Sequence, residues 1–272
     1  MPEGPEVQVV IRTLQEKLQD ALITDVEVFY PKLEEDGHLT DLIGQRIRKF
    51  SRLGKYMIFE TDDYDWIAHM RMEGKFYVFF SAPEDRRHIH AIFHLDDGRY
   101  LCYHDTRKFG RMSVYPKTED LHSLPMLKNV GYDYTDPHVT GDYLYQEIHH
   151  SRRCLKMALL DQRIIAGIGN IYANEICFAC GLDPRSRCTR LSKKDCALIV
   201  DVTRRILNEA DALGGTTVHS FASGFGVTGR FQQHLQVHMQ DGKPCPRCGH
   251  TIEKIMVQNR GTYLCRNCQK RK

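Results

Sequence analysis

The stretch that decides the fold is residues 244–269, PCPRCGHTIEKIMVQNRGTYLCRNCQ. It holds two Cys-x-x-Cys pairs, Cys245 with Cys248 and Cys265 with Cys268, separated by sixteen residues. Each pair can present two thiolates from one short turn to a single tetrahedral ion, and the separation is typical of zinc ribbons. Because four cysteines fill the coordination sphere, the pattern predicts one structural Zn²⁺ that stabilises a β-hairpin and does not activate water.

The residues around these cysteines are strongly cationic. From Asp241 onward the chain has eight Lys or Arg residues against two acidic ones. Four buried free thiols are a poor alternative to zinc, since so polar a tail cannot bury a core of its own. The polar residues near the predicted hairpin tip suit contact with phosphates, but a solvated surface loop explains them equally well. These tip residues are Lys254, Gln258, Asn259 and Arg260.

The whole chain has the composition of an ordinary globular protein: 272 residues, 42% hydrophobic and 27% charged, with a net charge of +3. This excludes collagen-like, coiled-coil and wholly disordered classes, and the length predicts two domains with a small appendage. No apolar run is long enough for a membrane span, and the first residues lack the pattern of a secretory signal. We therefore expect a cytoplasmic protein. Cys177 and Cys180 lack a partner pair and fit packing within a helix.

Upstream of the cysteines, the spacing pattern of the apolar residues changes twice. Residues 5–19 place apolar side chains at helical spacing behind Pro5, which predicts an amphipathic helix. Residues 22–115 alternate short aromatic or β-branched runs with Gly-Lys, Asp-Asp and Asp-Gly turns, which predicts an antiparallel sandwich or barrel. Residues 116–140 hold three prolines and Gly131 and predict the interdomain connection.

Helical spacing returns after residue 140. We expect helices near 142–150, 153–160, 170–180 and 192–212. The Gly- and Ser-rich residues that follow, 214–231, predict a mobile loop. Between two of the helices lies AGIGN, residues 166–170, whose two glycines allow close approach of a ligand to a helix N-terminus. A phosphate suits this position, with Asn170 as an added donor, although such a turn is common.

The N-terminus, MPEGPEV, is a third signal. Removal of Met1 before a small residue would leave Pro2 as a secondary α-amine, a ready nucleophile at neutral pH. Attack of such an amine on a sugar C1′ gives an iminium that acidifies C2′ and allows elimination of phosphate, and Glu3 could move protons. These residues by themselves favour the plainer reading that they begin the first helix. If Met1 is retained, the Pro2 nitrogen is an amide and cannot form the Schiff base.

Taken together, these pieces resemble the formamidopyrimidine-DNA glycosylase and endonuclease VIII family, in one order and over nearly the whole chain. The matching stretches are PEGPEV at 2–7, RLGKY at 52–56, HMRMEGKF at 69–76, DTRKFGR at 105–111, LLDQRIIAGIGNIYANE at 159–175, and the cysteine segment from CPRCG to NRGTYLCRNCQ.

The resemblance implies an α+β multidomain fold. It predicts a catalytic N-terminal helix and antiparallel β-sandwich at 1–115, a linker at 116–140, a helix-two-turn-helix domain at 141–235 with a lesion-capping loop at 216–230, and a C-terminal zinc-finger β-hairpin at 240–272. The implied partner is duplex DNA containing oxidised bases or abasic sites, bound by a monomer in the bacterial cytosol.

The resemblance also implies roles for individual residues. Pro2 is the expected Schiff-base nucleophile, Glu3 the general acid, Lys55 a phosphate ligand that supports β-elimination, and Arg260 the phosphate clamp for δ-elimination. Met72, Arg107 and Phe109 are expected to enter the duplex when the damaged nucleotide is everted. His88, Lys156 and Asn170 match backbone contacts, and Glu6 a carboxylate near the pocket. His88 and His90 are expected on one face of a strand.

Two subtypes remain open at this stage. HMRMEGKF and the stretch TTVHSFASGFGVTGRF at 216–231 resemble the type that excises 8-oxoguanine and formamidopyrimidines, whereas Gly4 resembles endonuclease VIII, which prefers oxidised pyrimidines. A non-catalytic damaged-DNA-binding protein would need Asn170, Arg260 and the zinc alone. The chain departs from the family at His238-Met239, usually Tyr-Gly; a positive φ there would strain Met239.

Overall fold

The structure is a computed structural model that describes residues 1–216 and 229–272. Contacts divide the chain into two units. Unit 1 contains residues 1–129 with Thr216 and Gly229, and unit 2 contains residues 130–215 and 230–272. The predicted connection 116–140 spans this division, and most of the predicted capping loop 216–230 lies outside the described residues.

Unit 1 begins with α1 (Gly4–Leu18), which agrees with the predicted helix at 5–19. Glu3 is its N-cap and Pro5 lies in its first turn, where a missing N–H costs nothing. The side chains at helical spacing, Val7, Leu14 and Leu18, are fully buried. Burial of this apolar stripe fixes the helix to the sheets and holds its N-terminal carboxylates in place.

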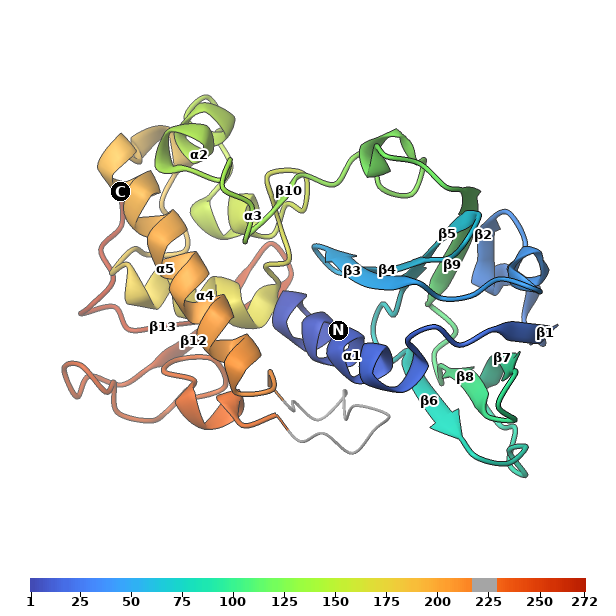
Figure 1. Ribbon diagram of the computed structural model, residues 1–272. Coiled ribbons are helices and arrows are strands. Elements are labelled where there is room, and N and C mark those ends of the chain that lie inside the picture. Colours follow the sequence, from blue (N-terminus) through green and yellow to red (C-terminus); the bar gives the residue numbers. More distant parts are fainter. Residues whose placement is uncertain (217–228) are drawn as a thin grey trace. The chain divides into compact units, whose positions relative to one another are not determined.

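Two sheets form the rest of unit 1 (Figure 1). One has the order β2-β9-β5-β4-β3 and the other β1-β7-β8-β6. All pairs are antiparallel except β2 with β9. The strands are β1 (Ile23–Val28), β2 (Glu34–Asp36), β3 (Lys49–Leu53), β4 (Tyr56–Glu60), β5 (Tyr64–His69), β6 (Lys75–Phe79), β7 (Ile89–Leu95), β8 (Tyr100–His104) and β9 (Arg111–Pro116).

The two sheets pack face to face through a buried aromatic cluster. The Trp66 ring lies 4.5 Å from the Phe93 ring and 4.2 Å from the Phe59 ring, centroid to centroid. Trp66 on β5 and Phe93 on β7 belong to different sheets, whereas Phe59 lies on β4, the neighbour of β5 in the same sheet. All three rings lie at inward-facing positions. The predicted antiparallel sandwich is therefore confirmed.

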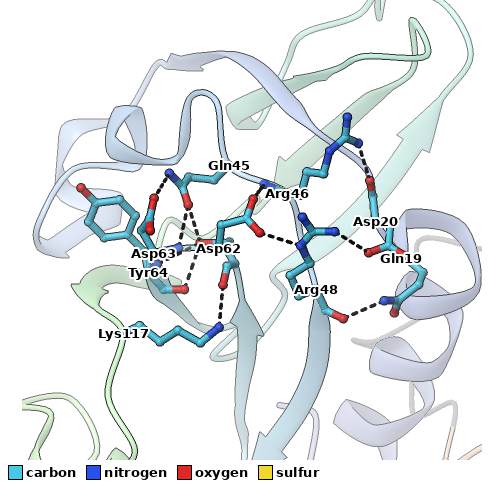
Figure 2. A network of polar contacts seen from close by, with 10 residues as sticks. Gln19, Asp20, Gln45, Arg46, Arg48, Asp62, Asp63, Tyr64 and Lys117 are labelled. Carbon is cyan, nitrogen blue, oxygen red and sulfur yellow. Dashed lines mark hydrogen bonds and ion pairs between the residues drawn. The ribbon is translucent and has the colours of Figure 1, made fainter.

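A polar network fixes the far end of α1 to the five-stranded sheet (Figure 2). Arg48 donates to Asp62 at 2.6 Å and to Asp20 at 3.2 Å, while the Gln19 amide donates to the Arg48 carbonyl at 2.7 Å. These groups are largely exposed, so we expect them to orient α1 relative to the sheet and to add little to the stability of the fold. Acidic partners balance both arginines of this network, since Arg46 pairs with Asp96 and Arg48 with Asp20 and Asp62.

Unit 2 is mainly helical. Its helices are α2 (Gly141–Ile148), α3 (Leu155–Leu159), α4 (Asn170–Ala179) and α5 (Lys193–Ala212). The short strand β10 (Tyr132–Asp133) precedes these helices and pairs in parallel with β11 (Ile165–Ala166), which lies between α3 and α4. The strands β12 (Glu253–Val257) and β13 (Arg260–Leu264) pair as the C-terminal hairpin.

The described residues of the two units also form five 3₁₀ turns. They are Pro31–Leu33, Leu39–Leu42 and Leu121–Ser123 in unit 1, and Cys188–Arg190 and Phe231–His234 in unit 2.

The helices of unit 2 pack closely around one core. A Cβ on Gly141 would lie 2.6 Å from the Ala197 Cα, so α2 and α5 approach more closely than any larger residue allows. Cys177 is fully buried in this core, as expected for helix packing. Among the residues that the structure describes, no helix has the length and apolar character that a bilayer crossing requires.

Candidate active site and zinc site

In unit 1, two carboxylates meet at the N-terminus of α1. Glu3 and Glu6 are only 3% and 4% exposed. They form a reciprocal capping box, in which the Glu3 N–H donates to the Glu6 Oε2 at 2.9 Å. The other Glu6 oxygen accepts from the Thr216 N–H at 2.7 Å and from its hydroxyl at 3.0 Å. The helix dipole favours negative charge at this helix N-terminus. The first of the two buried carboxylates, Glu3, directly follows Pro2 in the chain.

Lys55 adds a cation to this cluster. It is 5% exposed and lies in the turn between β3 and β4, after Gly54 with φ of +60°. Burial lowers the pKa of the Met1 α-amino group; Glu3 and Glu6 oppose this shift, and the Lys55 ammonium adds to it. An α-amine, two carboxylates and a lysine therefore share one electrostatic environment at the start of the chain.

His69, at the end of β5, belongs to the same surroundings, although the sequence did not single it out. It is 6% exposed, and its Nδ1 accepts from the Arg71 N–H at 2.9 Å. Burial lowers the pKa of His69 well below its usual value, and the cations Arg71 and Lys55 lower it further. The ring is therefore neutral and carries its proton on Nε2. Only its three-dimensional proximity to Lys55 identifies it.

The predicted duplex-entering residues lie on two loops that pack against Tyr103. A Cβ on Gly74 would lie 2.1 Å from the Tyr103 hydroxyl oxygen, and one on Gly110 only 1.7 Å from it. Glycine is therefore required in both loops. The loop before Gly74 carries Met72, which is partly exposed, and the loop before Gly110 carries Phe109, which is 47% exposed.

Asp105 organises the second of these loops. Its buried carboxylate accepts from the backbone N–H groups of Arg107 and Phe109 at 2.9 Å and of Gly110 at 2.8 Å. The Arg107 guanidinium then lies over the Phe109 ring, 4.8 Å from its centroid. The Thr106 hydroxyl donates to Glu73, which ties this loop to the one that holds Met72. The exposed cation and ring thus stand on a rigid base.

The expectation that His88 and His90 share one face of a strand is wrong. His88 precedes β7 and has φ of +63°, which turns the chain before the strand begins. His88 is exposed, whereas His90 is 5% exposed and its Nε2 contacts the Asp105 carbonyl at 2.7 Å. Alternation applies only within extended backbone, so the turn separates the two rings.

In unit 2, the AGIGN turn contacts the C-terminal hairpin. Asn170 is the first residue of α4, and its Nδ2 donates to the Gly261 carbonyl at 3.2 Å. Gln162 holds the turn: its side chain accepts from the Gly167 N–H at 3.1 Å and donates to the Ile168 carbonyl at 2.8 Å. The sequence did not single out Gln162, because an amide in a loop has no distinctive spacing.

Lys156 is fully buried beside this turn. Its ammonium donates to the Asn174 Oδ1 at 2.9 Å, to the Gly261 carbonyl at 2.9 Å and to the Thr262 hydroxyl at 2.7 Å. Each of these acceptors can take one N–H of the ammonium. A direct phosphate contact by Lys156 stays a prediction; in the structure the lysine joins α3, α4 and β13.

The hairpin presents Arg260 at its tip. Gln258 and Asn259 have φ of +44° and +61°, the conformation that a two-residue hairpin turn requires. Arg260 is exposed directly after this turn, and its carbonyl accepts from the Thr262 hydroxyl at 2.9 Å. A guanidinium on a short, rigid turn has the geometry to bind a phosphate.

The four predicted metal ligands lie together. The Sγ atoms of Cys245, Cys248, Cys265 and Cys268 are all within 4.8 Å of one another. The Cys245 and Cys268 sulfurs are 3.8 Å apart, and those of Cys248 and Cys265 are 3.5 Å apart. A tetrahedral ion with Zn–S bonds of about 2.3 Å separates its sulfurs by roughly 3.8 Å. The residues therefore fit one Zn²⁺ with no open position for water.

The departure at His238-Met239 has the predicted backbone consequence. Met239 has φ of +58° and is 47% exposed, so a β-carbon stands in a conformation that favours glycine. His238 is buried, and Glu175 accepts its backbone N–H at 2.8 Å. The segment that leads into the zinc finger is thus held by α4 despite the strained residue.

Comparison with known families matches three successive parts of the chain. Residues 1–112 match the formamidopyrimidine-DNA glycosylase N-terminal domain, residues 130–222 the formamidopyrimidine-DNA glycosylase H2TH domain, and residues 242–271 the zinc finger found in FPG and IleRS. These matches span all the segments in which the site residues lie.

Individual relatives agree with the family matches. A formamidopyrimidine-DNA glycosylase of Lactiplantibacillus plantarum is 40% identical over 97% of this chain and 98% of its own length. One from an Exiguobacterium species is 38% identical over 100% of both chains. Among solved structures, Lactococcus lactis Fpg in complex with DNA containing an N7-benzyl-Fapy-dG has a TM-score of 0.91 at 34% identity, covering 99% of this chain and 100% of its own. The MutM (Fpg) protein of Thermus thermophilus has a TM-score of 0.89 at 32% identity and covers 100% of both chains.

Proposed function

The chain belongs to the formamidopyrimidine-DNA glycosylase family, and from this premise we propose that it is a bifunctional DNA glycosylase and abasic-site lyase of base-excision repair that excises oxidised purines. Its substrate is duplex DNA with 8-oxoguanine, a formamidopyrimidine or an abasic site. The observation that carries the proposal is the buried cluster of Glu3, Glu6 and Lys55 at the amino terminus. The capping box accounts for Glu3 and Glu6 as helix caps, but a helix terminus alone does not require a buried lysine beside them.

The reaction begins at Pro2 once Met1 has been removed. The Pro2 nitrogen attacks the sugar C1′, the glycosidic bond breaks, and the base leaves with a proton that Glu3 supplies. The product is an iminium between Pro2 and the opened sugar. Burial of the amino terminus supports this step, because burial lowers the pKa of an α-amine and leaves more of it neutral.

The iminium then drives strand cleavage. Loss of a C2′ proton expels the 3′ phosphate in β-elimination, and a second elimination expels the 5′ phosphate, which leaves a one-nucleotide gap. Lys55 binds phosphate near the lesion and supports the first elimination. Arg260 clamps the phosphate for the second, a role that its exposure on a rigid turn supports. Zinc, held by the four cysteines, supplies no reaction step and stabilises the hairpin that carries Arg260.

Duplex binding uses groups in both units. Met72, Arg107 and Phe109 enter the space left by the everted nucleotide, where an exposed ring under a guanidinium replaces lost stacking. His88 contacts the DNA backbone from its exposed turn, and Asn170 contacts the DNA backbone from the N-terminus of α4. Lys156 acts on the phosphates through the hairpin it holds. We propose a monomer in the bacterial cytosol, as the relatives are bacterial proteins.

Borohydride trapping tests the proposal. Protein of verified intact mass and lacking Met1 is incubated with duplexes that contain 8-oxoguanine opposite cytosine, thymine glycol, or no lesion. We expect a covalent adduct on 8-oxoguanine from this protein, and none from a separately isolated fraction that retains Met1. A preference for thymine glycol would keep the chemistry and reverse the subtype. No adduct on any damaged duplex would favour a DNA-binding protein without catalysis.

A further inference from the structure

A chain of side-chain contacts leads from His238 to the hairpin turn. The Asn174 Nδ2 lies 2.8 Å from the His238 Nδ1, and the Asn174 Oδ1 accepts from the Lys156 ammonium at 2.9 Å. The same ammonium donates to the Gly261 carbonyl at 2.9 Å. Gly261 directly follows Arg260. All of these groups lie in unit 2, and His238, Asn174 and Lys156 are buried.

Elementary hydrogen-bond chemistry fixes the protonation of this chain. An ammonium can only donate, so the Asn174 oxygen must face Lys156 and the Asn174 NH₂ must face His238. The His238 Nδ1 then has to accept, which requires the neutral ring with its proton on Nε2. A proton on Nδ1 would oppose two donors and turn the amide away from Lys156. That ammonium is fully buried, so losing an acceptor would be costly.

The surroundings of His238 keep the ring neutral. Burial lowers the pKa of His238 to about 4, and the ammonium groups of Lys156 on α3 and Lys254 on β12 add to this shift. Tyr263 on β13 packs edge-on against the ring at 5.0 Å between centroids. The Glu175 carboxylate on α4 accepts the His238 backbone N–H. The acceptor on Nδ1 is therefore present throughout the neutral pH range.

We propose that His238 is a positioning residue for Arg260: by accepting from Asn174 it holds the amide that holds Lys156, and Lys156 holds the backbone of the residue next to Arg260. This inference rests on the proposed role of Arg260 in δ-elimination. The family usually has tyrosine at this position, so the proposed role is specific to the histidine of this chain. The Asn170 contact to the same Gly261 carbonyl completes the support.

Two variants at one position separate the acceptor from the ring. His238→Phe keeps an aromatic ring against Tyr263 but has no acceptor. His238→Asn loses the ring but places an amide oxygen near the position of Nδ1. We expect His238→Phe to slow δ-elimination relative to β-elimination roughly tenfold, the effect of losing one buried hydrogen bond in a charged network. His238→Asn should stay within about twofold of the unchanged protein.

The assay follows both elimination products on an abasic-site duplex, with zinc content and borohydride trapping measured alongside. The Gly261 carbonyl ¹³C shift reports on the contact itself; it should move in His238→Phe and return in His238→Asn. Arg260→Ala serves as the reference. If Arg260→Ala leaves the product ratio unchanged, the proposed role of Arg260 fails, and the Gly261 shift still decides the role of His238. If His238→Phe leaves that shift unchanged, or leaves the ratio unchanged while Arg260→Ala alters it, the inference is overturned.

Discussion

Replacing Asp105 by asparagine should loosen the loop that carries Arg107 and Phe109. One Asp105 oxygen accepts from Arg107, and the other accepts from both Phe109 and Gly110. Asparagine has a single acceptor oxygen. At best it keeps the bonds to Phe109 and Gly110 and turns its NH₂ toward the Arg107 N–H, so that two donors face each other.

The cost follows from these three bonds. Losing one charge-assisted bond and leaving its donor unpaired costs about 2 kcal/mol. The two remaining bonds become neutral and together lose about 1 kcal/mol more, since charge-assisted bonds are roughly twice as strong. We therefore expect Asp105→Asn to lower stability by about 3 kcal/mol, which corresponds to a fall of roughly 9 °C in the unfolding midpoint of a domain of this size.

Calorimetry and two activity assays test this expectation. In the proposed mechanism this loop enters the DNA duplex during excision of 8-oxoguanine, so that excision should slow about tenfold, the counterpart of about 1.4 kcal/mol in the barrier. Cleavage of a preformed abasic site should change much less. Asp85→Asn is the matched control, because Asp85 also accepts an N–H two residues ahead but lies on an exposed turn. An unchanged midpoint together with equal effects on both substrates would refute the role assigned to Asp105.

Three further predictions follow from other parts of the structure. Cys248→Ser, or zinc removal by a chelator, should weaken DNA binding before unit 1 unfolds; unaltered affinity after verified metal loss would contradict the support by zinc. Met239→Gly should raise stability by about 1 kcal/mol, because it relieves the left-handed backbone of an exposed residue; a lower denaturation midpoint would count against strain there. The hydrogen bond from Arg163 lowers the pKa of Asp161, as does that from Arg153. This stabilisation is present above about pH 4 and is lost as the pH falls, so Asp161→Asn should flatten the acid limb of a urea-denaturation series.

Much of this architecture could be predicted because its signals are local. The zinc ligands are two pairs of cysteines on short turns, and α1 is a run of apolar residues at helical spacing behind a proline. The sandwich follows from alternating strands with recognisable turns. Each of these patterns depends on residues within a few positions of one another, where spacing along the chain determines spacing in three dimensions.

The site was only partly visible from the sequence. Pro2, Glu3 and Lys55 could be named from the resemblance, but neither the burial of the Glu3 and Lys55 side chains nor the neutral His69 beside Lys55 could be inferred from spacing. The relative positions of His88 and His90 could not be predicted from strand alternation, because a positive φ at His88 turns the chain before the strand begins. The role of Asp105 could not be predicted, because it accepts backbone N–H groups, which any aspartate in a loop can do.

By itself, then, the sequence determined the zinc ribbon, the order of helices and strands, and the family to which the chain belongs. Only the tertiary structure decided how Arg260 is supported. Lys156 lies 105 residues from Gly261 along the chain, yet it donates to the Gly261 carbonyl. His238 acts on the same carbonyl through Asn174, 64 residues before it. The physical reason is that a buried ammonium must find its acceptors wherever the fold brings them, and no local pattern records that choice.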